Sequence, residues 1–479
     1  MAEEAIPADA NYDVVDAETG EVIKITGEEA KLLDEDEEEG EDVGGGLVIG
    51  IDRRDGVEST VGAIEAAEAA AATPAPPAVD LARCSFTGHS GPVYSACGTD
   101  AALGLALSGG GDDAAYLWDL ATGAVRHALK GHTDSIVAVS LNCDGSLAAT
   151  AALDSTVKVW SVASGELLHT LEGPSEDVVW MTWHQKGNVV LAGSSDGTAW
   201  MWHVAPATET KASVAAVMQV FAGHESSVTC GCFSPNGKIV CTAGTDGTLR
   251  LWKPKGSGAP PECVHVFRGH GWHDAPIVAA RTHPTLPLLM TGDVEGCIRV
   301  ISIRKRRVVA AFRHAASADG VHNSVEAVGF CSTHGWCASG GMDDKVYVWD
   351  LEMTMDNNRH IRHRLAHPAG VVKLEWHRSE PLLFTSCLDG IARLFDARNG
   401  QCLFRYTGHN DIVLDICLLY PTADPAAAGG SGAGAGAGAA ATKTAGAASE
   451  LLLLTGSDDG VAKVFAVDLS GVEPHKVKR

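Results

Sequence analysis

One type of segment recurs along this chain, and its recurrence limits the possible folds more than any other feature. The repeated unit ends in a short apolar run that usually contains Trp or Phe. Such runs occur eight times: YLWDL (116–120), VKVWSV (157–162), AWMWHV (199–204), LRLWKP (249–254), IRVISI (298–303), VYVWDL (346–351), ARLFDA (392–397) and AKVFAV (462–467). An active site is built once per domain, whereas a unit that cannot bury its own apolar face must be stacked many times. The unit is therefore structural.

Each repeat contains the pattern of four short β-strands. In the second repeat, the runs IVAVSL, LAATAAL, TVKVWSV and LLHTL are separated by NCDGS, DS and ASGE, which are turn-forming segments. A spacing of about 40 to 50 residues is typical of β-propeller blades. The sequence therefore predicts an all-β chain in which each repeat supplies one four-stranded blade.

A His, a hydroxyl, an Asp and a Trp recur at fixed spacing within these repeats, and in this respect the chain resembles the WD-repeat family over residues 81–470. The resemblance implies that Asp accepts a hydrogen bond from His, that His meets the hydroxyl, and that the hydroxyl meets the indole N–H. A hydroxyl held between strands lacks the cleft and oxyanion hole of a hydrolase. We therefore expect structural networks and no catalytic residues. Three repeats carry complete sets: His89, Ser108, Asp112 and Trp118; His132, Thr150, Asp154 and Trp160; His224, Thr242, Asp246 and Trp252.

The chain is expected to form a closed ring. LARCSFTGH (81–89) has the features of an outer strand but no repeat precedes it, while the last repeat lacks a clear fourth strand. Pairing the two would leave no open end in the ring. We predict eight blades closed by this N-terminal strand. Seven blades are the alternative if the fifth or sixth repeat is incomplete, because the fifth has Glu295 and Ile301 where Asp and Trp are expected.

Segments outside the repeats have a different composition. Residues 1–79 are predicted to be a disordered acidic tail and linker, and residues 80–470 the propeller. Up to residue 80 there are 23 Asp and Glu against 4 Lys and Arg, so this part carries 19 of the 25 net negative charges. Residues 421–450 are a Gly/Ala-rich segment that predicts a flexible insertion in the last repeat. Residues 471–479 form a short basic C-terminal tail.

The 13 Cys residues of a chain without a signal peptide or a long apolar segment indicate a reducing compartment. We therefore expect a cytoplasmic protein, a monomer, with no membrane contact. Cys230 and Cys232 lack a second pair or a His at zinc spacing, so no metal is expected. No phosphate-binding loop or catalytic signature occurs, and we expect no cofactor and no enzymatic activity.

Acidic residues follow the Gly-His position in several repeats, and the corresponding loops should share one face of a propeller. Their charge would attract cationic protein segments and disfavour direct nucleic-acid binding. Trp180 is a further candidate anchor for a partner. On the opposite face, Arg304–Arg307 form a basic turn that could hold the acidic tail when no partner is bound. The candidate acids are Asp134, Glu176, Asp177, Glu225, Asp274 and Asp411.

The third repeat, EDVVWMTWHQKGNVVLAGSSDGTAWMWHV (176–204), resembles the corresponding repeat of the angio-associated migratory cell protein family, as do GGMDDKVYVWDLE and the KVF of the last repeat. That family includes a fungal chaperone dedicated to one basic large-subunit ribosomal protein. The resemblance implies a chaperone or assembly factor that captures such a protein, through its basic N-terminal segment, on the acidic face. The alternative is a cytoplasmic scaffold that binds peptide motifs in signalling or cell migration. The shared negative charge of this face favours the chaperone, because a scaffold needs no particular sign of charge.

Overall fold

The structure is a computed structural model that describes residues 11–15, 22–26, 79–99, 104–204, 216–255, 259–314, 323–352, 360–421 and 450–470. The chain divides into two compact units, residues 1–81 and residues 82–479. The first contains an antiparallel pair, β1 (Asn11–Val15) with β2 (Val22–Thr26). Otherwise the predicted tail lies outside the described residues, as do most of the insertion and the C-terminal residues. Within these ranges no helix has the length and apolar character needed to cross a bilayer.

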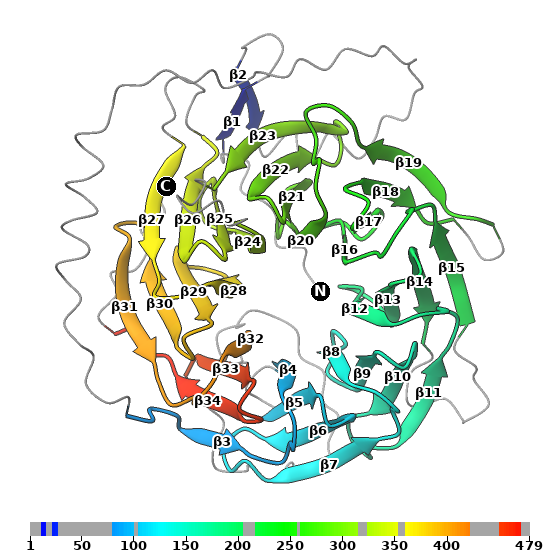
Figure 1. The fold of residues 1–479 in the computed structure, drawn as a ribbon, viewed down its shortest axis with the longest axis vertical. Coiled ribbons are helices and arrows are strands. Elements are labelled where there is room, and N and C mark those ends of the chain that lie inside the picture. Colours follow the sequence, from blue (N-terminus) through cyan, green and yellow to red (C-terminus); the bar gives the residue numbers. More distant parts are fainter. Residues whose placement is uncertain are drawn as a thin grey trace, which may run out of the picture. The chain divides into compact units, whose positions relative to one another are not determined.

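The second unit is a ring of eight four-stranded antiparallel sheets, as predicted (Figure 1). In each blade the first strand lines the centre and the last lies on the circumference. Blade 1 consists of β4 (Val93–Gly98), β5 (Leu105–Gly110), β6 (Ala114–Asp119) and β7 (Val125–Lys130), and blade 2 of β8 (Ile136–Leu141), β9 (Leu147–Ala152), β10 (Val157–Ser161) and β11 (Leu167–Leu171). Blade 3 consists of β12 (Val178–Trp183), β13 (Val189–Ser194), β14 (Thr198–His203) and β15 (Ala216–Ala222), and blade 4 of β16 (Cys230–Phe233), β17 (Val240–Ala243), β18 (Leu249–Lys253) and β19 (Glu262–Phe267).

The irregular fifth and sixth repeats both form complete blades, so the seven-blade alternative is wrong. Blade 5 consists of β20 (Ile277–Thr282), β21 (Leu288–Asp293), β22 (Cys297–Ser302) and β23 (Arg307–Arg313), and blade 6 of β24 (Val325–Phe330), β25 (Trp336–Gly341), β26 (Lys345–Asp350) and β27 (Ile361–Ala366). Blade 7 consists of β28 (Val371–Trp376), β29 (Leu382–Cys387), β30 (Ala392–Asp396) and β31 (Gln401–Tyr406), and blade 8 of β32 (Val413–Leu419), β33 (Leu452–Ser457), β34 (Ala462–Ala466) and the N-terminal strand β3 (Cys84–Phe86).

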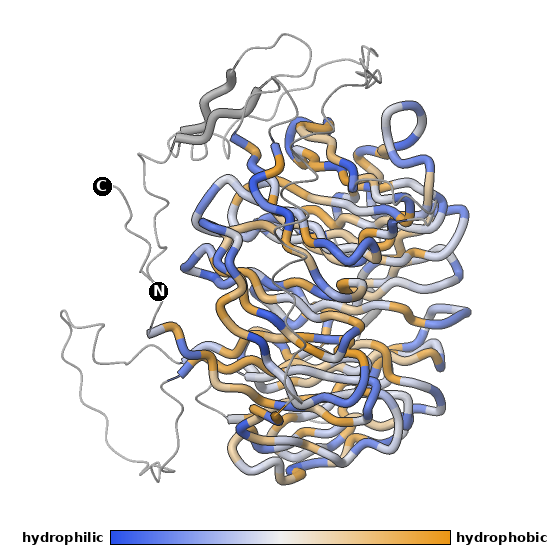
Figure 2. Tube along the Cα trace, turned by 60° about the vertical axis from the view of Figure 1, so that its left-hand side comes forward, coloured by the Kyte–Doolittle hydropathy of each residue, from blue (hydrophilic) through white to orange (hydrophobic). Residues whose placement is uncertain are grey.

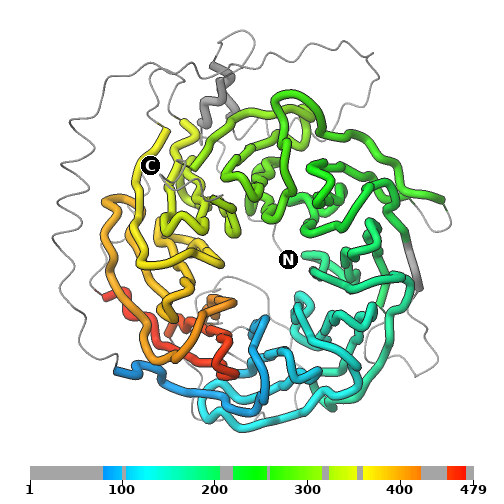
Figure 3. The backbone as a smooth tube through the Cα atoms, viewed as in Figure 1, coloured from blue at the N-terminus to red at the C-terminus, as the bar shows by residue number. Residues whose placement is uncertain are grey.

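The eighth blade joins the two ends of the repeat array, which confirms the predicted closure. Strand β3 pairs antiparallel with β34, and Phe86 lies opposite Ala462; the blue first strand and the red last strand lie side by side in Figure 3. The blade is also tied to both neighbours. Asp415 accepts the backbone N–H of Ala96 in blade 1 at 3.0 Å and lies 3.4 Å from the Lys373 ammonium in blade 7.

Apolar side chains fill the spaces between adjacent blades. Figure 2 shows hydrophobic segments running mainly through the blades and hydrophilic segments mainly in the loops. At the closing interface, the Phe86 ring stacks on the Trp118 ring of blade 1, with centroids 5.0 Å apart and planes 8° from parallel. Both rings are almost fully buried. The N-terminal strand therefore contributes to the core as well as to the sheet.

The inner strands share one irregularity near their start. In seven of the eight blades the register with the second strand shifts there, so that one extra residue of the inner strand has no partner across the ladder. Such β-bulges redirect a side chain away from its place in the regular pleat. The bulged residues are Tyr94, Val137, Val179, Val278, Glu326, Val372 and Leu414.

Replacing Phe86 by Ala should destabilise the propeller by about 3 to 5 kcal/mol, because the substitution leaves a cavity at the closing interface. The exposed neighbour Ser85 provides the control, and Ser85→Ala should change the free energy of unfolding little. Denaturant unfolding followed by tryptophan fluorescence measures both. Equal stability of the two variants would show that β3 does not contribute to the closed ring.

Candidate binding face and the networks beneath it

The three complete sets predicted from the sequence each come together as a chain of hydrogen bonds. In the fourth repeat, the Trp252 indole N–H donates to Thr242 Oγ1 at 2.8 Å, His224 Nε2 lies 2.9 Å from that oxygen, and His224 Nδ1 lies 3.0 Å from Asp246. The sets of His89 and His132 have corresponding distances between 2.8 and 3.1 Å. Four polar side chains are thus paired with one another between strands that exclude water.

The direction of these bonds follows from the chemistry of the groups. A carboxylate can only accept, so Nδ1 carries the proton, and the neutral ring then accepts the hydroxyl proton at Nε2. Burial lowers the pKa of His132 and favours this neutral form. Although burial alone would raise it, bonds from His224 and from the Thr248 backbone hold the pKa of Asp246 far below its usual range. Hydrogen bonds likewise lower the pKa of Asp154 although its burial opposes them, so the His132 set pairs a neutral imidazole with an ionised carboxylate.

The fifth and sixth repeats contain networks that the sequence analysis missed or misplaced. In the fifth, the Gly269-His270 pair is at the expected place in the sequence, but His273 occupies the site: His273 Nδ1 lies 2.6 Å from Asp293, and Nε2 lies 2.7 Å from Thr291 Oγ1. The extra residues of GHGWH displace the His along the chain. Asp293, at the end of β21, therefore acts in place of the Asp that was expected at position 295.

The sixth repeat has a complete set that escapes a search for Gly-His. His314 follows Arg313, and 29 positions separate it from Asp343, compared with 22 in the fourth repeat. Its Nδ1 nevertheless lies 3.0 Å from Asp343, and its Nε2 lies 2.7 Å from Ser339 Oγ. The Trp349 indole donates to the same hydroxyl at 2.8 Å. A Ser or Thr, an Asp and a Trp at constant spacing were the signal that could have located it.

The remaining repeats retain parts of the pattern. In the third, Ala192 replaces the hydroxyl, and the buried Trp202 indole N–H has no hydrogen-bond partner among the described residues. In the seventh, Asp389 pairs with Arg393 instead of with His367. The eighth keeps His409, Asp459 and Thr455, and Phe465 takes the place of Trp.

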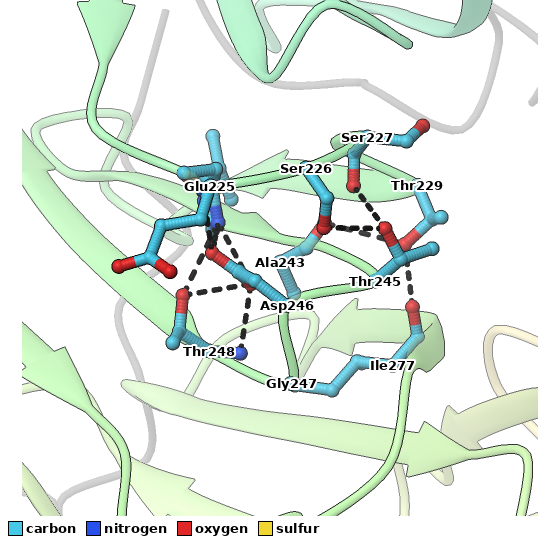
Figure 4. Close-up of polar contacts among 12 residues, drawn as sticks. Glu225, Ser226, Ser227, Thr229, Ala243, Thr245, Asp246, Gly247, Thr248 and Ile277 are labelled. Carbon is cyan, nitrogen blue, oxygen red and sulfur yellow. Dashed lines mark hydrogen bonds and ion pairs between the residues drawn. The ribbon is translucent and has the colours of Figure 1, made fainter.

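One end of the propeller is formed by the loops from each outer strand to the next inner strand, together with the turns between second and third strands. We call it the acidic face. The same backbone bond joins the two kinds of loop in all eight blades, as between the Ser195 N–H and the Asp177 carbonyl. The six candidate acids lie in these loops and are exposed. None of the six forms an ion pair with another described residue. Figure 4 shows the Glu225 side chain directed away from the bonds around Asp246.

Further carboxylates reach the acidic face from the turns between second and third strands, and the sequence analysis did not include them. Asp113, Glu295 and Asp344 are exposed in these turns, and Asp458 is half-exposed. Repeated acidic pairs next to the network Asp, as in GGDD, MDDK and SDDG, could have revealed most of them. Exposed cations at this end lie toward the circumference, at the ends of outer strands: Lys130, Arg268 and Arg313.

The opposite face carries mixed charge. Arg304, Lys305 and Arg306 are exposed in the turn between β22 and β23, as the topology predicts. Turns between first and second strands hold a group that sequence reasoning missed, a His that caps the turn. His283 Nδ1 accepts the backbone N–H groups of Thr285 and Leu286 at 3.1 and 2.9 Å, and its ring packs against Phe330 of the next blade. His184 and His377 occupy equivalent positions.

Trp180, the candidate anchor, lies between two blades. Its indole N–H donates to the Val228 carbonyl of blade 4 at 2.8 Å, and the ring covers Gly193 and Gly231. Part of the ring remains exposed. The contacts give Trp180 a structural role between blades, and a role in partner binding stays a prediction. Within the described ranges, no group of three His, Cys, Asp or Glu side chains is placed to hold a metal ion.

These features define an eight-bladed WD40 propeller, a class of protein that typically serves as a non-enzymatic platform for protein interactions. The family WD domain, G-beta repeat matches six segments of the chain: residues 123–161, 165–203, 216–253, 261–302, 317–350 and 359–396. Relatives define the protein further. The chain is 32% identical over 348 residues to the dog (Canis lupus familiaris) angio-associated migratory cell protein, covering 71% of this chain and 75% of that one. It belongs to the angio-associated migratory cell protein family.

Similarity to ribosome assembly proteins is more distant. The chain is 28% identical over 149 residues to the Saccharomyces cerevisiae ribosome assembly protein SQT1, covering 31% of this chain and 28% of that one. The Sqt1 crystal structure superposes with a TM-score of 0.67 at 21% identity, over 81% of this chain and 99% of that one. Chaetomium thermophilum Sqt1, bound to the N-terminus of ribosomal protein L10, superposes with a TM-score of 0.65 at 19% identity, over 81% and 100% of the two chains. These structures share the fold.

Asp246→Asn should lower the free energy of unfolding by about 1 to 3 kcal/mol, because the amide cannot accept all the bonds that the carboxylate accepts. Partner binding by the folded fraction should be unchanged. Asp274→Asn, at an exposed acid, is the matched control for stability. Chemical denaturation measures both variants, and a normal transition together with lost binding in Asp246→Asn would contradict a structural role.

Stability should fall as the pH is lowered from about 6.5 to about 4. Burial lowers the pKa of His283 to about 4 and, together with Arg393, that of His367 to about 4. Each folded-state pKa lies below the unfolded value, so the stabilisation is complete above pH 6.5 and is lost as the pH falls through the folded pKa. Each loss is on the order of 3 kcal/mol. Denaturation across this pH range should show a shallower dependence in His283→Asn, and an unchanged slope would contradict the assignment.

Proposed function

We propose that this protein is a cytosolic chaperone or assembly factor that captures a basic large-subunit ribosomal protein on the acidic face during ribosome biogenesis. One observation carries the proposal: the six exposed carboxylates in the loops of one face are not neutralised by ion pairs with other described residues. The likeness to SQT1, and to a Sqt1 that binds a ribosomal protein N-terminus, supports it.

Electrostatics explains why such a face suits a basic client. A surface of one sign raises the rate of encounter with oppositely charged segments. An Arg- or Lys-rich segment that is exposed before its assembly with RNA would find carboxylates in place of phosphates. The negative field would also disfavour nucleic acid at the site, so the client would exchange the chaperone for RNA.

A signalling scaffold is the competing function, and the two differ in what they require of the surface. A scaffold that binds varied peptide motifs needs no single sign of charge. Affinity purification of the full-length protein from lysate, followed by mass spectrometry, separates the two. A single dominant basic ribosomal protein supports the chaperone, whereas a range of signalling proteins would support the scaffold.

Reversing Glu176 and Asp177 to Lys should reduce capture of the client at low salt and make the association rate less dependent on salt. Loop charges act mainly on the encounter rate, and these two carboxylates are exposed. We expect association to slow by at least about tenfold at low ionic strength. Stopped-flow fluorescence across a salt series with the purified client measures the rate.

A matched charge change on the opposite face provides the control. Glu166, in the turn between β10 and β11, and Glu262, at the start of β19, are exposed there. The double variant Glu166→Lys and Glu262→Lys changes net charge by the same amount, so association should slow much less. If the two double variants slow association equally, net charge and not the acidic face determines capture.

A further inference from the structure

The bulged residues of the inner strands form a second set of side chains near the acidic face. Six of the seven are apolar or aromatic, namely Tyr94, Val137, Val179, Val278, Val372 and Leu414, and the seventh is Glu326. We call these seven residues the mouth ring. Each is the second residue of its inner strand and therefore follows directly on an acidic-face loop.

The exposure of these side chains places them at the mouth of the central channel. The two faces of an inner strand are covered by the inner strands of the neighbouring blades, as those of β8 are by β4 and β12. One edge of the strand pairs with the second strand of its own blade, and the other edge borders the central channel. An apolar side chain near its start can therefore reach solvent only toward the channel or the acidic face. All seven residues are partly exposed, and Tyr94 is 38% exposed. The regular residue just before each of them is fully buried, as Val178 is before Val179.

The contacts of Tyr94 are independent evidence that the mouth ring lies at the acidic face. A Cβ on Gly111 would lie 3.3 Å from the Tyr94 ring, and Gly111 belongs to the turn between β5 and β6. A second apolar group continues the surface in blade 6, where Met342 is 37% exposed in the equivalent turn. Its sulfur lies beside Gly370, which directly precedes β28, the strand whose second residue is Val372. Exposed apolar groups thus occur at several points around the mouth.

The distance between the acids of the acidic face and the mouth ring determines how long a ligand must be to contact both. Asp177 precedes Val179 by two positions, Asp411 precedes Leu414 by three and Asp274 precedes Val278 by four. An extended chain rises about 3.3 Å per residue, so each of these acids lies at most roughly 7 to 13 Å along the chain from its mouth-ring residue. One apolar side chain at the mouth and Arg or Lys side chains one to three residues away on the same peptide would reach both sets.

We propose that the mouth ring is an anchor site for one apolar or aromatic side chain within the basic segment that the acidic face attracts. The proposal rests on the proposed function and specifies its ligand as an extended basic peptide with a single large apolar residue. Charge would determine how fast the peptide arrives, and burial of the apolar residue would determine how long it stays. Glu326 adds a carboxylate at the mouth, next to the site of the apolar residue.

Two synthetic peptides test the proposal with the full-length protein. Both are short Arg-Ser peptides, one with a central Phe and one with Ala at that position. Burial of the Phe ring should make the first bind about tenfold or more tightly, mainly through slower dissociation. Both should show the same steep salt dependence, because their charges are equal. Surface plasmon resonance across a salt series measures the two rates.

Matched variants locate the anchor. The double variant Val372→Ser and Leu414→Ser removes two adjacent members of the mouth ring. The control, Val125→Ser and Leu403→Ser, makes the same two changes at exposed positions on the outer strands β7 and β31. The mouth variant should bind the Phe peptide as weakly as the Ala peptide, whereas the control should keep the preference. Thermal unfolding establishes that both variants are folded.

The outcomes distinguish the two proposals. If both peptides bind the wild type equally and with steep salt dependence, the acidic face acts alone and the anchor is wrong. A Phe preference that survives in the mouth variant also overturns it. If neither peptide binds at low salt, the proposed function is wrong, and the anchor with it.

Discussion

A four-stranded blade cannot bury both of its faces by itself, and the rest of this structure depends on that constraint. Each blade is stable because its neighbours cover it, so the array must either close or leave two apolar faces and two strand edges in water. Closure here uses β3, a three-residue strand from the start of the array, whose Phe86 ring completes the core between the first and last blades. The position of every loop on the acidic face follows from this ring.

The polar networks separate the requirements of the fold from those of the surface. In the turns between second and third strands, the Asp of the network is committed to His and to backbone amides, as Asp246 is. Neighbouring positions such as Asp113 and Glu225 take part through their backbones at most and present their carboxylates to solvent. The surface can therefore change its charge while the blades remain the same.

The repeat pattern alone predicted the architecture, including eight blades and their closure, because strand patterning and turn residues are local properties of the sequence. The networks at His273 and His314 were missed because insertions change the spacing in sequence but not the position in space. The turn-capping role of His283 and the bulges could not be predicted either. A bulge depends on the register between two strands, and in the sequence the extra Val in VV or IV runs looks like ordinary strand. The disorder of the N-terminal tail and the flexibility of the insertion stay predictions.

The pairing of residue 84 with residue 464 has a consequence for biosynthesis. Nearly every other sheet contact joins strands that are adjacent along the chain, so seven blades can form as soon as they are translated. The eighth blade needs both ends of the array. Pairing β3 with β34 closes a loop that contains all the chain between them, at an entropic cost that local hairpins do not have. Until the last strands leave the ribosome, the protein is an open arc whose mouth ring is incomplete. Under the function proposed above, competence to hold a client therefore arises in one late step, when β34 pairs with β3.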